Sequence, residues 1–353
     1  MTPFPRPAYR ALKPYRPDRR PVAVDLSDNT NLRGPNPAAL EAVRNSPAED
    51  LARYPSVYAD PFLDAVVRGF GVPREAVTTG CGSDDILDSL FRAVAEPGEG
   101  VAFLDPTFSM ASIFARMNGA EPMAIPGIPL PDPEALLRGD PAVVYLCSPN
   151  NPTGEALPTE WVEQLLAASR TRRGGGPVVV LDEAYAEYAS ESWLDRAPEI
   201  PGLVVARTLS KAYGLAGIRA GFAVGDPRVI AELEKSRGPY KVSRVGERAA
   251  VAALDDPSGW VRATVEEVLE SRSRVSEALA ELGYSPLESQ ANFVLVPVRD
   301  AALTTAALRE RGVAVRPFPG IPGLGDAVRV SVGRWDYMER FLEALESLAE
   351  DGP

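Results

Sequence analysis

The stretch AVVYLCSPNNPTGEAL, residues 142–157, joins a run of apolar residues to a polar loop that precedes a helix-like segment. A continuous apolar run of this length is typical of a β-strand that is buried on both faces. The loop contains two asparagines, two prolines and a glycine, which are common turn residues. We therefore expect a buried strand followed by a loop, and the loop is either a simple turn or part of a binding site.

Short aliphatic runs of the same kind recur along the first two thirds of the chain, at residues 101–104, 178–181 and 203–206. Segments with helical spacing of apolar residues, 86–94 and 160–169, lie between them. Strands that alternate with helices predict an α/β fold with a mostly parallel central sheet flanked by helices.

The pattern changes after about residue 245. A long helix-like segment is followed by short strand-like segments and a final amphipathic helix, which is typical of a smaller α+β domain. The chain begins with a Pro- and Arg-rich segment that we expect to be extended and to pack with that domain. The predicted organisation is an N-terminal arm (1–40), a large domain (41–245) and a small C-terminal domain (246–353).

Composition excludes several kinds of function. The 353 residues carry a net charge of −12 and include no histidine, so histidine-based catalysis and a nucleic-acid partner are not expected. The two cysteines have no metal-ligand spacing and suit a reducing cytoplasm, and no apolar run approaches the ~20 residues of a membrane span. We expect a cytoplasmic protein with no metal ion.

Polar residues follow each predicted strand, and parallel strands bring such residues to one edge of the sheet. Lys211 is either a solvated surface lysine or an amine that has lost solvation and become a nucleophile. Asp182 is either a turn former or a buried carboxylate that needs a cationic partner, such as a protonated pyridine nitrogen. Gly82-Ser83-Asp84 precedes a predicted helix and could bind an anion, with Ser210 and Arg219 completing a phosphate site.

Eleven motifs occur in an order that resembles the fold-type I pyridoxal-phosphate aminotransferases, and within them the histidinol-phosphate aminotransferase branch. They cover nearly the whole chain: LSDNTNLRGPNP (26–37), ARYPSVY (52–58), TGCGSDD (79–85), DPTFSMA (105–111), CSPNNPTG (147–154), DEAYAEY (182–188), TLSKAYGLAGIRAGF (208–222), GPYKVS (238–243), ANFVL (291–295), VRPFPG (315–320) and VRVSVG (328–333).

The resemblance implies pyridoxal 5′-phosphate as the cofactor and a homodimer as the active unit. It implies that Lys211 holds the cofactor covalently and moves a proton, that Asp182 pairs with the ring nitrogen, and that Tyr185 contacts the ring oxygen. The other implied cofactor contacts are Asn151 to the ring oxygen, Phe108 to the ring face, Gly82, Ser83, Asp84, Thr208, Ser210 and Arg219 to the phosphate, and Tyr54 to the phosphate of the neighbouring subunit.

The resemblance also implies substrate contacts from Arg316 and Arg329, from the arm residue Tyr15, and from Asn31. The chain departs from the branch at Phe108, where tyrosine is usual, and in Asn29-Thr30-Asn31, which is closer to the related threonine-phosphate decarboxylases. The resulting prediction is an aminotransferase that uses a small amino donor and an oxo acceptor, with histidinol phosphate and 2-oxoglutarate as the first choice.

Two alternatives within the family are an aminotransferase for aromatic or specialised biosynthetic amino acids and a threonine-phosphate-type decarboxylase. A third alternative is a cofactor-binding regulator of transcription. That design needs a DNA-binding domain, and we expect the N-terminal arm of 40 residues to be too short and too proline-rich to supply one.

Overall fold

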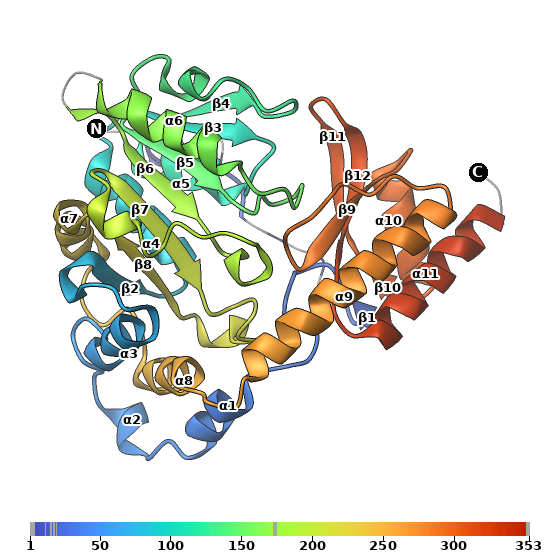
Figure 1. Cartoon of the computed structure of the whole chain (residues 1–353), viewed down its shortest axis with the longest axis horizontal. Helices are drawn as coiled ribbons and strands as arrows, with labels where there is room; N and C mark the ends of the chain where they lie inside the picture. The colour runs from blue at the N-terminus through green and yellow to red at the C-terminus, as the bar shows by residue number, and fades with distance from the viewer. Residues whose placement is uncertain are drawn as a thin grey trace.

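The computed structural model describes residues 4–10, 12–14, 16, 18, 20–171 and 175–350. Within these residues the chain forms a large domain around a seven-stranded sheet and a small domain around a three-stranded sheet. The long helix α9 (Trp260–Glu281) leads from the large domain and lies along the small one (Figure 1).

The central sheet has the strand order β2-β8-β7-β6-β5-β3-β4. Strand β8 runs antiparallel to both of its neighbours, and the pairs β7–β6, β6–β5, β5–β3 and β3–β4 are parallel. This confirms the mostly parallel sheet that the sequence predicts. The strands are β2 (Val77–Gly80), β3 (Gly100–Asp105), β4 (Glu121–Pro126), β5 (Val143–Cys147), β6 (Val178–Asp182), β7 (Leu203–Thr208) and β8 (Gly221–Gly225).

The inner strands β5, β6, β7 and β8 are buried on both faces. Successive side chains of a strand point to opposite faces, so each strand contributes to two apolar cores. On β5, Val144 and Leu146 pack into one apolar core, and Val143 and Tyr145 pack into the other. Each fully buried aliphatic side chain contributes ~1.5–3 kcal/mol relative to an exposed one. The helices of this domain are α1 (Pro37–Arg44), α2 (Glu49–Ala52), α3 (Asp60–Phe70), α4 (Ser83–Val94), α5 (Met110–Asn118), α6 (Thr159–Arg170), α7 (Pro227–Arg237) and α8 (Arg244–Leu254).

Helix starts follow ordinary capping chemistry. The Asn36 side chain accepts a hydrogen bond from the Ala39 amide, and Pro37 occupies the first helical position of α1. Short 3-10 turns occupy several connections: η2 (Arg74–Ala76), η3 (Pro133–Leu137), η5 (Ala186–Tyr188), η6 (Ala197–Glu199) and η7 (Ala216–Ile218).

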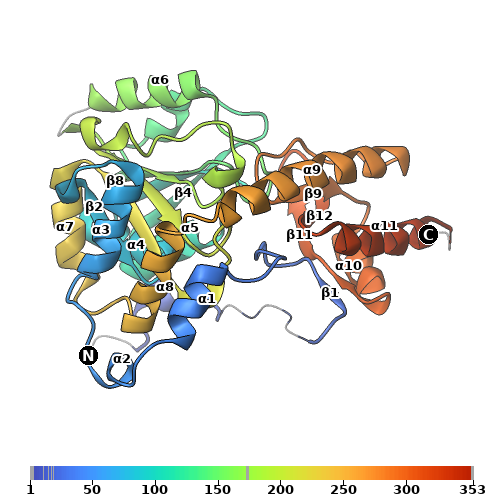
Figure 2. The ribbon, with the colours of Figure 1, turned by 60° about the horizontal axis from the view of Figure 1, so that its bottom comes forward.

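Helix α8 lies in the large domain, although all but its first two residues fall beyond the predicted boundary at 245. It packs against α1 and α3, as Figure 2 shows, and its residues Ala249, Ala250 and Ala253 are part of the large apolar core. The prediction missed this because the alanine-rich face of α8 resembles the helical pattern of the small domain in sequence. The change of domain therefore lies between α8 and α9.

The small domain contains β9, β11 and β12 in the order β11-β12-β9, all antiparallel. The N-terminal segment contributes β1 (Val24–Asp25), which pairs with β10 in parallel. Val24 and Leu26 are buried in the core of the small domain, so this part of the predicted arm packs there. The remaining elements are η1 (Pro7–Tyr9), β9 (Phe293–Pro297), α10 (Ala301–Glu310), β10 (Val313–Ala314), β11 (Arg316–Ile321), β12 (Gly325–Ser331) and α11 (Trp335–Glu350).

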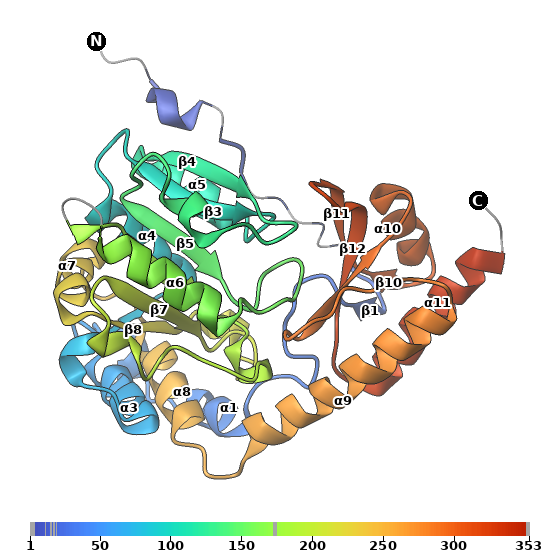
Figure 3. The ribbon, with the colours of Figure 1, turned by 45° about the horizontal axis from the view of Figure 1, so that its top comes forward.

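The start of the described chain takes a different course from the rest of the arm. Turn η1 contacts α5 of the large domain, beside the edge strand β4 (Figure 3). The arm therefore crosses from the large domain to the small domain before the chain returns at α1.

Candidate active site

A cavity of about 590 Å³ lies where the carboxyl ends of β5, β6 and β7 face the small domain. Parallel strands deliver the residues that follow them to this edge, which is where α/β sheets bind ligands. The residues predicted from sequence that line the cavity are Ser83, Asp84, Phe108, Asn151, Asp182, Tyr185, Thr208, Ser210, Lys211, Arg219, Arg316 and Arg329.

One end of the cavity is suited to an anion. Helix α4 begins at Ser83, so its unpaired amide groups and positive dipole end are near the cavity. Arg219 Nη1 donates to Ser210 Oγ at 3.5 Å, and Arg219 Nη2 lies 3.2 Å from Asp84 Oδ2. Gly82 does not line the cavity, but a Cβ there would come within 2.8 Å of Arg219 Nη2. The absence of a side chain at Gly82 therefore leaves room for the guanidinium beside the helix start.

Asp182 ends β6 and is buried. Its Oδ2 accepts a hydrogen bond from the Tyr145 hydroxyl at 2.9 Å, and its Oδ1 accepts one from the Ala184 amide at 3.2 Å. Burial raises the pKa of Asp182 to about 6, and the Tyr145 hydrogen bond opposes this rise. A cation placed against the carboxylate would remove the cost of its burial.

Lys211 follows β7 and donates from Nζ to the Asp28 carbonyl at 3.2 Å. Its ammonium group lies 5.7 Å from the centre of the Tyr185 ring. Burial, together with the positive charge of the nearby Arg329, lowers the pKa of Lys211 to about 8. An amine with this pKa is partly neutral near pH 8 and can act as a nucleophile or a base.

The two asparagines of the loop at residues 148–157 have different contacts. Asn150 holds the loop itself: its amide donates to the Pro106 carbonyl at 3.0 Å and its Oδ1 accepts from Thr107 at 2.9 Å. Asn151 lines the cavity, and its Oδ1 accepts from Arg329 Nη1 at 2.6 Å. The loop is therefore both a turn and part of the candidate site.

Two arginines from the small domain line the opposite side of the cavity. Arg316 on β11 and Arg329 on β12 are directly opposite each other in an antiparallel pair. Arg329 is buried, donates from Nη2 to the Ser27 carbonyl at 2.7 Å, and lies 5.3 Å from the centre of the Phe293 ring. Like charges opposite each other destabilise a sheet, so this arrangement suits an anionic ligand.

Besides Gly82, the predicted site residues Asn31 and Tyr54 do not line the cavity. Asn31 donates its amide to the Ala212 carbonyl at 2.9 Å and lines a separate, smaller pocket. Tyr54 is 79% exposed, and its ring stacks on that of Tyr240 at 4.8 Å. Tyr15 lies outside the residues that the structure describes.

The structure adds residues that sequence reasoning did not assign to the site. Asp28, Asn29 and Thr30, in the loop after β1, line the cavity beside Lys211. Tyr145 contacts Asp182 from the neighbouring strand, and its position inside an apolar run gave it the appearance of a core residue. The motif around Asn29 was visible in sequence, but which of its side chains faces the site depends on a turn that the sequence does not specify.

A buried ion-pair network supports the loop after β6. Arg207 on β7 donates from Nε to Glu183 at 3.0 Å, from Nη1 to Glu187 at 2.8 Å and from Nη2 to Ser192 at 2.8 Å. Glu183 follows Asp182 directly, so the network fixes the segment that carries Asp182 and Tyr185. Breaking such a buried pair leaves an uncompensated charge and is strongly destabilising.

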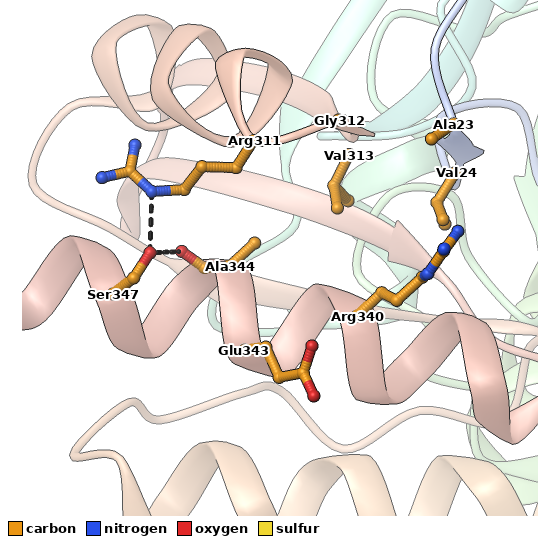
Figure 4. A pocket seen from close by; sticks show the side chains of 9 residues that line it. All are labelled: Ala23, Val24, Arg311, Gly312, Val313, Arg340, Glu343, Ala344 and Ser347. Carbon is orange, nitrogen blue, oxygen red and sulfur yellow. Dashed lines mark hydrogen bonds between the residues drawn. The ribbon is translucent and has the colours of Figure 1, made fainter.

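Another cavity, of about 380 Å³, lies in the small domain between α11 and the strands β1 and β10 (Figure 4). Arg311 donates to the Ser347 hydroxyl at 2.7 Å there, and none of the predicted site residues lines it. Among the described residues no group of His, Cys, Asp and Glu side chains is arranged to hold a metal ion, and no helix is both long and apolar enough to cross a membrane.

The candidate site therefore combines four groups: an anion-binding helix start, a buried carboxylate, an amine of lowered pKa, and a pair of arginines. These groups fit pyridoxal 5′-phosphate, because its phosphate, its basic ring nitrogen and its aldehyde match the first three in charge and reactivity. The arginine pair lines the other side of the cavity and suits a second, anionic molecule.

Comparison with known proteins agrees with this assignment. The sequence pattern of the family described as "Aminotransferase class I and II" matches residues 21–345. Histidinol-phosphate aminotransferase 1 of Nostoc sp. is 34% identical, with 99% of each chain covered. An aromatic amino acid aminotransferase of Thermobifida fusca is 37% identical, with 96% of each chain covered. The crystal structure of histidinol-phosphate aminotransferase from Sinorhizobium meliloti in complex with pyridoxal-5′-phosphate has a TM-score of 0.86 and 27% identity, covering 98% of this chain and 97% of that one.

Proposed function

The chain belongs to the class I and II aminotransferase family and is a pyridoxal-phosphate enzyme, and we propose that it moves an amino group between histidinol phosphate and 2-oxoglutarate. The proposal rests on the arginine pair, Arg316 and Arg329, which lines the same cavity as Lys211 and Asp182. Histidinol phosphate and 2-oxoglutarate are both anionic, and one guanidinium pair can serve each of them in turn.

The cofactor, when bound, supplies an electron sink for the electron pair that remains when a bond to the amino-acid α carbon breaks. To hold it we assign the amides at the start of α4 with Ser210 and Arg219 for the phosphate, and Asp182 for the ring nitrogen, because all of these residues line or border the cavity. The other contacts that we assign are Asn151 and Tyr185 to the ring oxygen, Thr208 to the phosphate, Phe108 to the ring face and Lys211 to the aldehyde carbon.

Lys211 is the residue that we assign to proton transfer during the reaction. Its lowered pKa leaves Nζ partly neutral near pH 8, so the amine can take a proton and return it. Asp182 remains ionised when it has a cationic partner, because a nearby positive charge lowers the pKa of a carboxyl. The hydrogen bond from Tyr145 to Oδ2 leaves Oδ1 available to such a partner alongside the Ala184 amide.

A donor screen tests the substrate assignment. Purified enzyme with 2-oxoglutarate is offered histidinol phosphate, and glutamate formation is measured. Histidinol, which lacks the phosphate, is the matched control. We expect histidinol phosphate to be preferred by at least ~10-fold in kcat/KM, because one charge-assisted contact is worth ~1.5–3 kcal/mol. Equal use of the two donors would contradict a phosphate-binding role for the arginines.

The second candidate is an aminotransferase for aromatic amino acids. The identity with the Thermobifida fusca enzyme supports it, as do Phe108 and Phe318 in the cavity. Phenylalanine is therefore the second donor in the same screen, and a preference for it over histidinol phosphate would select this reading. Threonine phosphate is the third donor, and release of carbon dioxide from it would indicate a decarboxylase.

We also propose that the active unit is a homodimer in which Tyr54 reaches the phosphate site of the neighbouring subunit. Apolar and aromatic side chains that are at least 40% exposed gather in one stretch of the chain, namely Leu51, Tyr54, Val57 and Tyr58. Tyr240 joins this surface, since its amide donates to the Val57 carbonyl at 2.9 Å. An exposed apolar patch of this kind is typical of an interface.

Tyr54→Phe tests the dimer arrangement without removing the ring. We expect the variant to remain a dimer by light scattering and to bind the cofactor more weakly, because only the hydroxyl contact is lost. A monomeric wild-type enzyme with full activity would refute the proposal.

We place the protein in the cytoplasm because Cys81 and Cys147 are both free thiols, which suits a reducing compartment.

A further inference from the structure

Asn29 lies at the point where the N-terminal segment passes between the two domains. It is buried, and its backbone adopts the left-handed conformation with φ of 54°. Asparagine tolerates this conformation better than most residues. Its backbone carbonyl accepts a hydrogen bond from Asn292 at 3.1 Å, and its amide N–H donates to Ser331 Oγ at 2.8 Å. The position of Asn29 is therefore fixed by two residues of the small domain.

The same contacts decide which way the Asn29 side chain faces. Ser331 Oγ accepts from the Asn29 backbone, so its single proton is available to donate, and it donates to Asn29 Oδ1 at 3.0 Å. The amide oxygen of Asn29 is thus directed at Ser331. Its Nδ2 group is left to donate to the Tyr185 hydroxyl, at 3.1 Å.

The consequence concerns the proton of Tyr185. A phenol has one proton to donate and can also accept. Because Asn29 donates to the Tyr185 oxygen, the Tyr185 proton is not needed for that contact and can be donated into the cavity that Tyr185 lines. The Tyr185 ring packs edge-on against the Phe293 ring, with 5.1 Å between the ring centres, and this contact limits the movement of Tyr185.

We propose that Asn29 is a positioning residue that presets Tyr185 as a hydrogen-bond donor to the ring oxygen of the cofactor. The inference rests on the cofactor-binding part of the proposed function and not on the identity of the substrate. It also makes Ser331, a small-domain residue, part of the chain of contacts that sets this donor.

The test measures how tightly the cofactor-free protein binds each of two cofactors. Pyridoxal 5′-phosphate carries the ring oxygen, and its 3-deoxy analogue lacks it. The Asn29→Asp substitution replaces the Nδ2 donor with a carboxylate oxygen, which would accept the Tyr185 proton and remove it from the cofactor. We expect Asn29→Asp to weaken the affinity for pyridoxal 5′-phosphate by at least ~10-fold, the equivalent of one charge-assisted hydrogen bond. We expect the affinity for the 3-deoxy analogue to change less than ~2-fold.

Tyr185→Phe supplies the control, because without the hydroxyl the substitution at position 29 has no proton to redirect. In the Tyr185→Phe variant, Asn29→Asp should change the affinity for both cofactors by the same factor. An equal loss of affinity for both cofactors in the otherwise unchanged protein would overturn the proposal and indicate a merely structural role. No loss for either would overturn it as well.

Asn29→Gly covers the case in which the aspartate variant does not fold. Glycine keeps the left-handed backbone at no steric cost and removes the whole amide. We expect a preferential loss of affinity for pyridoxal 5′-phosphate over the analogue, smaller than that of the aspartate variant. An equal loss for both would again overturn the proposal. The measurement uses no amino substrate, so a failure of the histidinol phosphate assignment leaves it unaffected.

Discussion

Replacing Lys211 with methionine should stabilise the cofactor-free protein while it abolishes the activity. Burial lowers the pKa of Lys211 from 10.5 to about 8 in the folded protein. At 1.36 kcal/mol per pKa unit, that difference corresponds to roughly 3 kcal/mol. Lys211 is partly exposed and donates a hydrogen bond to the Asp28 carbonyl, so the gain from methionine should be reduced to about 1–2 kcal/mol.

The effect of Lys211 on the free energy of unfolding should depend on pH. Between pH 8 and 10.5 the unfolded chain carries more protons on this lysine than the folded chain does, so the free energy of unfolding rises with pH in that window. The destabilisation that results from burying the charged Lys211 amine is present in full below pH 8 and disappears above pH 10.5. The stabilisation by Lys211→Met should therefore be largest at pH 7 and fall below about 1 kcal/mol at pH 10.

Urea unfolding of the cofactor-free protein at these two pH values, followed by circular dichroism, measures the effect. Lys235→Met is the matched control, because the Lys235 side chain is 69% exposed and pairs with the exposed Glu232. That surface change should alter the free energy of unfolding by no more than ~0.5 kcal/mol. A stabilisation by Lys211→Met that is the same at pH 7 and pH 10, or absent at both, would refute the desolvation argument.

Three other substitutions probe the site. Tyr145→Phe removes the hydroxyl that donates to Asp182, so cofactor affinity should fall by ~10-fold while the protein stays folded, and unchanged affinity by fluorescence titration would exclude this role. Asp182→Ala should leave the fold intact and slow turnover by at least ~100-fold in steady-state assays, because the electron sink weakens without its carboxylate partner; near-normal turnover would show that the pairing is wrong. Arg329→Ala should raise the KM for anionic substrates by ~10- to 100-fold, and an unchanged KM would remove Arg329 from the substrate site.

The central sheet could be predicted because its inner strands are continuous aliphatic runs. The runs at 101–104, 143–146, 178–181 and 203–206 all correspond to strands. Strands β2, β4 and β8 were not predicted, because the segments VTTG, EPMAIP and GFAVG contain glycine, proline or polar residues in place of a longer aliphatic block. Strands β2, β4 and β8 form because they hydrogen-bond to neighbouring strands of the sheet, and a local sequence pattern cannot show such pairing.

In the candidate site, too, some residues could be predicted from the local sequence and others could not. Residues at or shortly after the end of a predicted strand, such as Asp182 and Asn151, could be placed at the cavity because the strand brings the chain to that edge of the sheet. Asn29 depends on a single left-handed residue and on contacts with Ser331, which is 302 positions away. Tyr145 depends on the register of two strands, which brings its hydroxyl to Asp182. Long-range register of this kind is not contained in a local sequence pattern.

The cofactor-free site is destabilised by the same groups that serve the cofactor. Burial raises the pKa of Asp182 and lowers the pKa of Lys211, so each side chain reduces the free energy of unfolding near neutral pH. A cationic ring nitrogen beside Asp182 would restore its preference for the ionised form, and an aldehyde that consumes the Lys211 amine would remove a buried charge. The energy that the fold loses at these two positions is therefore recovered when the cofactor binds. A ligand that binds only the folded chain stabilises it according to its affinity, so replacing either residue should raise the stability of the cofactor-free protein and reduce the stabilisation that the cofactor adds.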